Sequence, residues 1–412
     1  MTQKDREILR ELAKVQLELA DSNMNREKIS LWKRHNAMKG ERPVIHIEIG
    51  GYRHEVIDSR MRCEDADARA LELSLLCQFS NAELFGDDMP VPDYFPVGLS
   101  YDFRLFGHVI GRDTAADSTG REVGHKFNHI VTDLHNDFEK LMQPSVLLID
   151  REGPEAVKKL AEDTFGDILP IRYSGWCLGS SPTQKVVHWM GLETMLISMY
   201  DYPEEFHLMM EKIAADTISC FDELAEKGML LPTTAFEGVG QGSRCFTDEL
   251  KSGSPVTSHD LWGYMDSQET VCVSPEMYGE FIFPYYERIA SQFGLLSYGC
   301  CEAVHPIWDY LKNLKNLRKI SISAWCDEDY MAEQLRGQSI IYHRKPSANF
   351  LGLGEKLDED AFRAYIEKTV RTAHGCHLEI TQRDLYTINN DIGKVRRYVE
   401  IIRESIERYW KP

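Results

Sequence analysis

The chain has 412 residues, of which 43% are hydrophobic, and its formal net charge at pH 7 is −19. This length and apolar content allow two or three domains or one large domain with insertions. The acidic charge argues against a general nucleic-acid surface, which needs a basic stripe, and no apolar run is long enough to predict a membrane span. The first residues lack a signal-peptide core, so we expect a cytoplasmic protein whose ten cysteines are thiols or metal ligands.

Residues 1–40 are the first predicted element, a polar helical arm. Short apolar segments then alternate with longer amphipathic ones. The predicted strands cover residues 44–49, 95–99, 168–173, 229–235, 261–265, 294–298, 319–323, 339–343 and 376–381. The predicted helices cover residues 66–77, 154–162, 203–227, 275–292, 305–314, 328–334 and 359–373.

This alternation predicts β/α units around a parallel sheet. Eight or nine units favour a (β/α)₈ TIM barrel over residues 41–412. The alternative, an open doubly wound sheet, lacks its glycine-rich dinucleotide turn. Ser274 as N-cap and Pro275 at the first position predict the start of one helix. The leucines of the arm predict packing on a second subunit in a homodimer, or on the bottom of its own barrel.

Two adjacent thiols and a carboxylate, Cys300, Cys301 and Glu302, end one predicted strand, and Cys376 is predicted to close another. Thiolates and carboxylates are ligands for a catalytic zinc ion, which keeps one coordination position open. If both strands belong to one barrel, we expect Cys300 and Cys376 to share one zinc ion. The alternative is that these are buried, inert cysteines.

Polar side chains at the ends of the predicted strands are the other candidates, because a (β/α)₈ barrel builds its active site there. His46 and Glu48 alternate within the first strand and therefore face the interior, in a functional role or as a buried pair. The candidates for substrate binding are His46, Glu48, Tyr101, Trp176 and Tyr298. The candidates for catalysis are Asp266, Glu269 and His343, the last of which also fits a structural ion pair. Lys345 and Asp384 belong to the wider set of polar residues at strand ends.

Several segments resemble the uroporphyrinogen decarboxylase superfamily over about residues 165–405, and within it the corrinoid-dependent methyltransferases. They are Trp-Cys-Leu-Gly at 176–179, Asp-Tyr-Pro-Glu at 201–204, Ser-Pro-Glu-Met-Tyr at 274–278 and Phe-Pro-Tyr-Tyr at 283–286. The first strand lacks the arginine-rich segment of true uroporphyrinogen decarboxylase, which makes a porphyrinogen substrate the weaker prediction.

In the methylcobalamin:coenzyme M methyltransferases of this superfamily, a His-x-Cys motif and a distant cysteine hold zinc. Cys300 matches the first cysteine and Cys376 resembles the distant one, whereas Tyr298 stands at the histidine position. The resemblance therefore implies that Cys301, Glu302 or Glu237 supplies the missing zinc ligand.

The resemblance implies a zinc-dependent methyltransferase that moves a methyl group between a small substrate, such as a methoxylated aromatic, and a separate corrinoid protein. Zinc would act as a Lewis acid, while Asp266, Glu269 and His343 orient the substrate or handle the proton. The chain lacks the Asp-x-His-x-x-Gly corrinoid motif, so methylcobalamin or another corrinoid would come with the partner. The alternatives are a metal-free decarboxylase or lyase that uses Glu48 or Asp266, and a non-catalytic barrel that binds a ligand.

Overall fold

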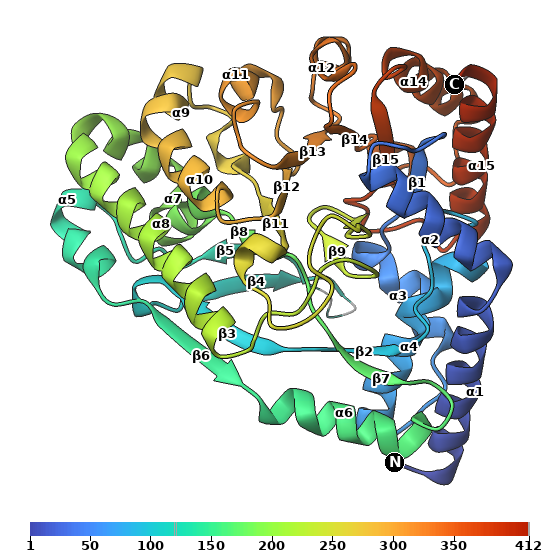
Figure 1. The fold of residues 1–412 in the computed structure, drawn as a ribbon. Coiled ribbons are helices and arrows are strands. Elements are labelled where there is room, and N and C mark those ends of the chain that lie inside the picture. Colours follow the sequence, from blue (N-terminus) through green and yellow to red (C-terminus); the bar gives the residue numbers. More distant parts are fainter. Residues whose placement is uncertain (119, 121, 411–412) are drawn as a thin grey trace.

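A computed structural model describes residues 1–118, 120 and 122–410 (Figure 1). The α-helices are α1 Gln3–Ala20, α2 Asn23–Asn36, α3 Arg53–Val56, α4 Ala66–Leu84, α5 Leu134–Asp137, α6 Glu152–Phe165, α7 Pro182–Asp201, α8 Pro203–Glu226, α9 Pro275–Phe281, α10 Phe283–Ala290, α11 Trp308–Leu311, α12 Glu328–Leu335, α13 Asn349–Gly352, α14 Glu359–Thr372 and α15 Ile392–Tyr409. The strands are β1 Val44–Ile47, β2 Phe95–Gly98, β3 Ser100–Arg104, β4 Arg112–Ala116, β5 Glu122–Phe127, β6 Val146–Asp150, β7 Ile171–Ser174, β8 Leu178–Ser180, β9 Gly238–Val239, β10 Ser243–Arg244, β11 Trp262–Met265, β12 Leu295–Tyr298, β13 Leu317–Ile322, β14 Ile341–Arg344 and β15 His377–Gln382.

A seven-stranded sheet organises the molecule, in the order β1-β15-β14-β13-β12-β11-β8. Every neighbouring pair in this sheet is parallel. Helices α9 to α12, α14 and α15 line its outer side (Figure 1). The carboxyl ends of all seven strands therefore meet along one edge, where α/β proteins place their sites.

The predicted α/β class is confirmed, but a closed eight-stranded barrel is not shown. Strand β2 pairs with β7 in a separate parallel pair, and residues 229–235 form no strand. At the free edge of β1, the Asp88 carboxylate accepts from the Ile45 N–H at 2.9 Å, and the Asp87 carboxylate accepts from the Ile47 N–H at 3.0 Å. Acidic side chains thus satisfy the backbone donors that a neighbouring strand would otherwise use.

Each of the other predicted strand segments overlaps a strand of the structure. The predicted helix start at Pro275 is also confirmed, because the Ser274 hydroxyl accepts from the Met277 N–H at 3.3 Å. The sequence did not predict helices α7 and α15, nor the antiparallel pairs β3–β6 and β4–β5.

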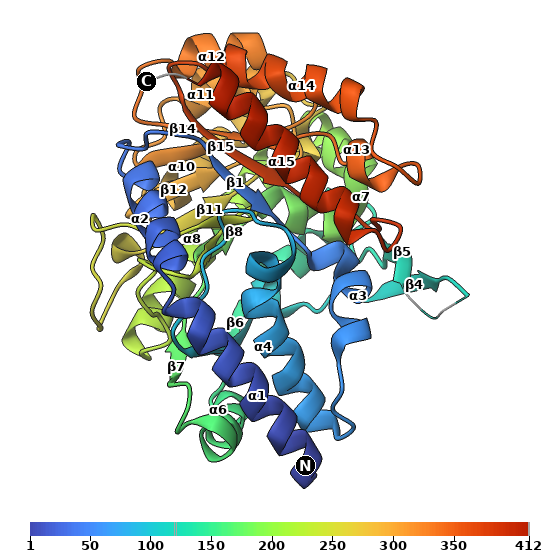
Figure 2. The same cartoon turned by 90° about the vertical axis from the view of Figure 1, so that its right-hand side faces the viewer.

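The N-terminal arm packs against its own chain. Helix α1 lies beside α4 (Figure 2). On α2, the buried Trp32 indole donates to the Asp88 carbonyl at 2.9 Å, and His35 Nε2 lies 3.3 Å from the Glu379 carboxylate of β15. The Asn36 amide donates to the carbonyls of Arg244 and Phe246. The arm therefore closes the N-terminal side of its own sheet, and the homodimer stays a prediction.

Within the described part of the chain, no helix combines the length and the apolar content needed to cross a bilayer.

Candidate active site

A sharp turn after β12 brings two thiols together. The strand ends at Tyr298, and Gly299 follows with a φ of 98°, a conformation that favours glycine. A Cβ atom at Gly299 would lie 2.8 Å from the Ser321 Cβ atom. The turn places the Sγ atoms of Cys300 and Cys301 3.6 Å apart, beyond the carboxyl end of the strand.

The two thiols have different partners and different acidities. The Cys300 thiol donates to Gln241 Oε1 at 3.3 Å, and the Cys301 thiol donates to Asp384 Oδ2 at 3.1 Å. The hydrogen bond with Cys301 lowers the pKa of Cys300, and the charge of Lys345 lowers it further against the effect of burial. The hydrogen bond with Cys300, burial and the nearby Asp384 raise the pKa of Cys301. Cys300 is therefore the thiol that ionises first.

A chain of hydrogen bonds connects Cys300 with Asp266. The Gln241 amide accepts from Cys300 and donates to the Tyr264 hydroxyl at 2.6 Å, and that hydroxyl donates to Asp266 Oδ2 at 2.5 Å. Asp266 is 6% exposed, and its Oδ1 has no hydrogen-bond partner among the described residues. Burial raises the pKa of Asp266. Tyr264, Ser181 and the charges of Lys345 and Arg383 oppose this effect. The carboxyl group therefore loses its proton less readily than an ordinary aspartate, and its Oδ1 is available to a ligand.

Buried charges surround these groups. The Glu302 carboxylate accepts from the Cys300 N–H at 2.6 Å and the Ser267 N–H at 3.2 Å, and burial raises its pKa to about 7. The Lys345 ammonium donates to the Cys300 carbonyl at 3.2 Å, and burial lowers its pKa to about 8. The carboxyl groups of this site therefore share the space with a cation that is close to losing its proton near neutral pH.

Arg383 adds a second cation near the thiols. Its Nε lies 3.2 Å from Glu48 Oε2 and 3.2 Å from Asp384 Oδ1. Against the effect of burial, the carboxylates of Glu48 and Asp384 raise the pKa of Arg383, and the two thiols add to this effect. The charge of Arg383 in turn lowers the pKa of Asp266.

The structure brings together some of the predicted residues. Asp266, Glu302, Cys300 and Cys301 form the centre of the site described above, and Glu48 reaches it through Arg383. Glu269 lies beside Asp266, whose charge helps to raise the pKa of Glu269, and it accepts from Thr183 Oγ1 at 3.1 Å.

Other predicted residues lie elsewhere. His343 contacts Thr381 Oγ1 at 2.8 Å and lies 3.5 Å from Glu379, deeper in the sheet, so it belongs to a buried ion-pair cluster. Tyr298 is fully buried, and its hydroxyl bonds with the hydroxyls of Ser267 and Tyr278.

The remaining predicted residues have local or peripheral contacts. His46 Nδ1 bonds with the Gly242 carbonyl beneath the site. Glu237 accepts from the Ala235 N–H at 2.8 Å. Tyr101 is 42% exposed on β3, and Trp176 is 62% exposed in the loop after β7.

The prediction that Cys376 shares a metal ion with Cys300 is wrong. Cys376 directly precedes β15, at the N-terminal end of the sheet, whereas Cys300 follows the carboxyl end of β12. A strand of six residues separates its two ends by roughly 20 Å. The Cys376 thiol is buried and donates to the Ala332 carbonyl of α12 at 3.5 Å.

A three-ligand zinc site does not fit the residues present. The 3.6 Å between the Sγ atoms of Cys300 and Cys301 is close to the ~3.8 Å expected for two thiolates on one tetrahedral zinc ion. However, no group of three His, Cys, Asp or Glu side chains within the described ranges could hold a metal ion. In Glu302, a predicted ligand, both carboxylate oxygens accept hydrogen bonds from backbone N–H groups.

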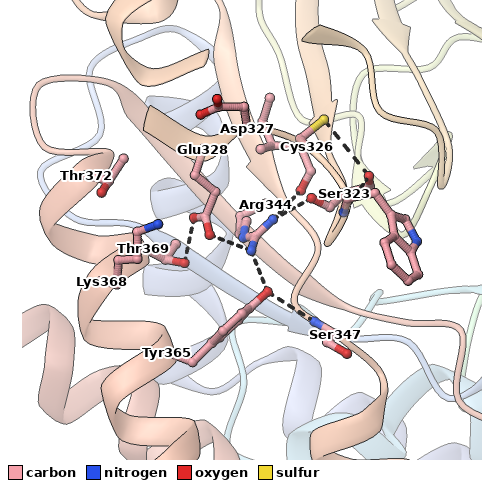
Figure 3. Close-up of polar contacts among 12 residues, drawn as sticks. Ser323, Cys326, Asp327, Glu328, Arg344, Ser347, Tyr365, Lys368, Thr369 and Thr372 are labelled. Atoms are coloured by element: carbon pink, nitrogen blue, oxygen red, sulfur yellow. Dashed lines mark hydrogen bonds and ion pairs between the residues drawn. The ribbon is translucent and has the colours of Figure 1, made fainter. Parts of the chain in front are cut away.

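An ion pair between Arg344 and Glu328 lies on the outer side of the sheet (Figure 3). Arg344 follows His343 and therefore points away from the interior. Its buried guanidinium donates to the Glu328 carboxylate at 2.7 Å and to the Ser323 carbonyl at 2.5 Å. The Ser323 hydroxyl in turn donates to the Glu302 carbonyl at 3.0 Å. Arg344 thus supports the site without entering it.

Three residues of the site were not predicted: Gln241, Tyr264 and Arg383. Tyr264 lies two positions before Asp266 on the same strand, so the alternation of side chains could have indicated it. Gln241 comes from the loop between β9 and β10, and nothing in its sequence context indicates that the loop reaches the thiols.

No protein-family model matches the sequence, and no curated protein is detectably similar to it. Among solved structures, the fold is similar to that of a methyltransferase from Methanosarcina mazei, with a TM-score of 0.50 and 12% sequence identity. The similarity covers 91% of this chain and 97% of the other. At this identity the likeness concerns the fold alone.

Proposed function

We propose that this chain is a methyltransferase that removes a methyl group from the oxygen of a small methylated substrate, such as a methoxylated aromatic. The observation that carries the proposal is Asp266: a buried carboxyl group with a raised pKa and an unpartnered Oδ1. The similarity in fold to a protein named as a methyltransferase supports the proposal without establishing it.

The side chains of the site suit the loss of a methyl group from an ether oxygen. When the carbon–oxygen bond breaks, the oxygen keeps the electron pair and needs a proton. Protonated Asp266 donates that proton from Oδ1, while Oδ2 stays hydrogen-bonded to Tyr264. Gln241 holds the Tyr264 hydroxyl and thereby keeps the carboxyl group oriented.

The methyl group needs an acceptor, and we propose that a separate corrinoid protein provides it. Large apolar side chains are exposed in loops that follow the carboxyl ends of β11 and β13, namely Val271 and Trp325. A partner that approaches this edge would contact them on its way to the site.

Zinc remains a separate part of the proposal. Cys300 and Cys301 are the two residues that would hold the ion, and the described side chains offer no third protein ligand beside them. The proton transfer from Asp266 does not depend on it. Elemental analysis of the purified protein and of a Cys300→Ser/Cys301→Ser variant tests this point, and equal zinc contents in both would contradict it.

A screen of methyl donors with a reduced corrinoid protein tests the proposed function. We expect a methoxylated aromatic to yield methylated corrinoid and the free phenol in equal amounts. Asp266→Asn should lower kcat by at least about 100-fold because it removes the general acid, and the wild-type rate should fall as pH rises through the raised pKa of Asp266.

Tyr200→Phe is the matched control, since Tyr200 is 75% exposed on α7 and the substitution removes only a hydroxyl group. Its rate should equal that of the wild type. No methyl transfer from any donor, or full activity of a folded Asp266→Asn protein, would refute the proposed function.

A further inference from the structure

A basic cleft lies at the N-terminal side of the sheet, away from the thiols. It is formed by α2, the end of α4 and α15, and its volume is about 540 Å³. Four cationic side chains and two carboxylates line it: Lys28, Arg34, Arg42, Arg403, Glu27 and Asp88. An excess of positive charge is unexpected in a chain whose net charge is −19.

One carboxylate serves two of the guanidinium groups. Asp88 Oδ1 accepts from Arg42 at 2.8 Å and from Arg403 at 3.0 Å. Asp88 Oδ2 accepts from Arg42 at 3.0 Å and from the Ile45 N–H at 2.9 Å. Arg42 also donates to the Pro43 carbonyl at 2.9 Å, and Arg403 donates to the Gly86 carbonyl at 2.7 Å. Because each guanidinium carries five N–H donors, both groups keep donors for a further anion.

Lys28 adds a third cation at the same wall. Its side chain is 8% exposed, and its ammonium donates to the Met89 carbonyl at 3.3 Å. Burial lowers the pKa of Lys28, and the charges of Arg403 and Arg42 lower it further, against the opposite effect of Asp87 and Asp88. Burial thus destabilises the charged form of Lys28, and a bound anion beside the ammonium would stabilise it.

We propose that this cleft binds a phosphorylated small molecule. Guanidinium groups match the geometry of phosphate oxygens, and the volume lies within the range of small-molecule sites. Met24, Leu31 and Ala82 supply an apolar wall for the organic part of the ligand. The site is independent of methyl transfer, because none of its lining residues belongs to the candidate active site.

Calorimetric titrations at constant ionic strength test the proposal, with inorganic pyrophosphate, ADP and adenosine as the probes. We expect pyrophosphate and ADP to bind with one-to-one stoichiometry, and adenosine to bind at least about tenfold more weakly than ADP, because it lacks the charged group. Chloride at the same ionic strength should give no saturable binding.

Two arginines of α2 provide a matched pair of variants. Arg34 lines the cleft and donates to the Ser30 hydroxyl at 2.7 Å, whereas Arg26 pairs with Asp21 at 2.8 Å and does not line it. Arg34→Gln should weaken the binding of pyrophosphate about tenfold, the effect of losing one charge-assisted hydrogen bond, and Arg26→Gln should leave it unchanged.

Lys28→Met is a second variant that removes a positive charge from the cleft. Thermal melting shows whether this variant is folded. A folded Lys28→Met protein should also bind pyrophosphate more weakly. The proposal is overturned if the wild type binds neither pyrophosphate nor ADP, if ADP and adenosine bind equally, or if Arg34→Gln and Arg26→Gln bind pyrophosphate with the same affinity.

Discussion

The two adjacent thiols differ in how readily each loses its proton, and Lys345 contributes to that difference. The pKa of Lys345 is lowered only to about 8, so its ammonium is largely charged at pH 7 and stabilises the Cys300 thiolate. Lys345→Met should therefore raise the pKa of Cys300 and slow its alkylation at neutral pH, by about tenfold for one unit of pKa.

Mass spectrometry after a short pulse of iodoacetamide measures this effect. In the wild type we expect the label on Cys300 before Cys301, whose pKa is raised. Lys345→Arg keeps the charge and should keep the rate of labelling. Labelling of Cys301 first, or equal rates in the wild type and Lys345→Met, would contradict the assignment of the thiolate.

The sequence indicated the central residues of the site but not their neighbours. Cys300, Cys301, Glu302 and Asp266 directly follow apolar strands, and that position alone places them at the carboxyl edge of a parallel sheet. The prediction for Cys376 failed because this residue precedes its strand instead of following it. The number of residues between Cys300 and Cys376 does not show at which end of the strand Cys376 lies.

At the scale of the elements, the Arg344–Glu328 pair joins β14 to α12. Both side chains are buried, and they lie 2.7 Å apart. Removing one partner leaves an uncompensated buried charge, so Arg344→Met should lower the free energy of unfolding by about 3–5 kcal/mol. The double variant Arg344→Met/Glu328→Leu should lose less, because no lone charge remains.

Denaturant unfolding of both proteins measures these differences. The control is the exposed pair Lys159–Asp163 on α6, where Lys159→Met should change the free energy of unfolding by less than about 1 kcal/mol. If the double variant is as unstable as Arg344→Met alone, the penalty does not come from the unpaired carboxylate.

Two buried histidines, His35 and His343, contribute to the pH dependence of stability. Burial lowers the pKa of His35 and that of His343. Below about pH 6.5 the unfolded chain binds protons that the folded chain does not, so the free energy of unfolding should fall with decreasing pH. Each histidine contributes up to about 1.4 kcal/mol per pH unit.

Unfolding free energies measured from pH 7 to pH 5 test this prediction through their slope. His35→Gln and His343→Gln should each reduce the slope, and His259→Gln, at an exposed position, should leave it unchanged. An unaltered slope in both buried variants would show that other groups take up the protons.

The sequence predicted most elements of the sheet because each strand is a short apolar segment between amphipathic helices. The prediction of a strand at residues 229–235 failed, because this largely apolar segment pairs with no other strand. The sequence also could not show how the sheet ends, because Asp87 and Asp88 bond with β1 only once the chain has folded. Closure of a barrel depends on such tertiary contacts, which periodicity does not encode.

At the scale of the whole molecule, the first strand of the chain depends on the last. Strand β1 has a single neighbour in the sheet, β15, and Val44 lies opposite Glu379. His35 of the arm contacts the same Glu379. Almost the entire chain separates these partners, and contacts of such separation form slowly.

This pairing has a consequence for synthesis on the ribosome. Residues 35–47 emerge early, but their partner strand β15 emerges only near the end of translation. Until then the apolar segment Val44–Ile47 has no neighbouring strand with which to form backbone hydrogen bonds. Asp87 and Asp88 arrive much sooner and can occupy one edge of that strand in the meantime. A chain released before residue 377 would lack the strand that completes β1, and it would expose an apolar edge to aggregation and to chaperones.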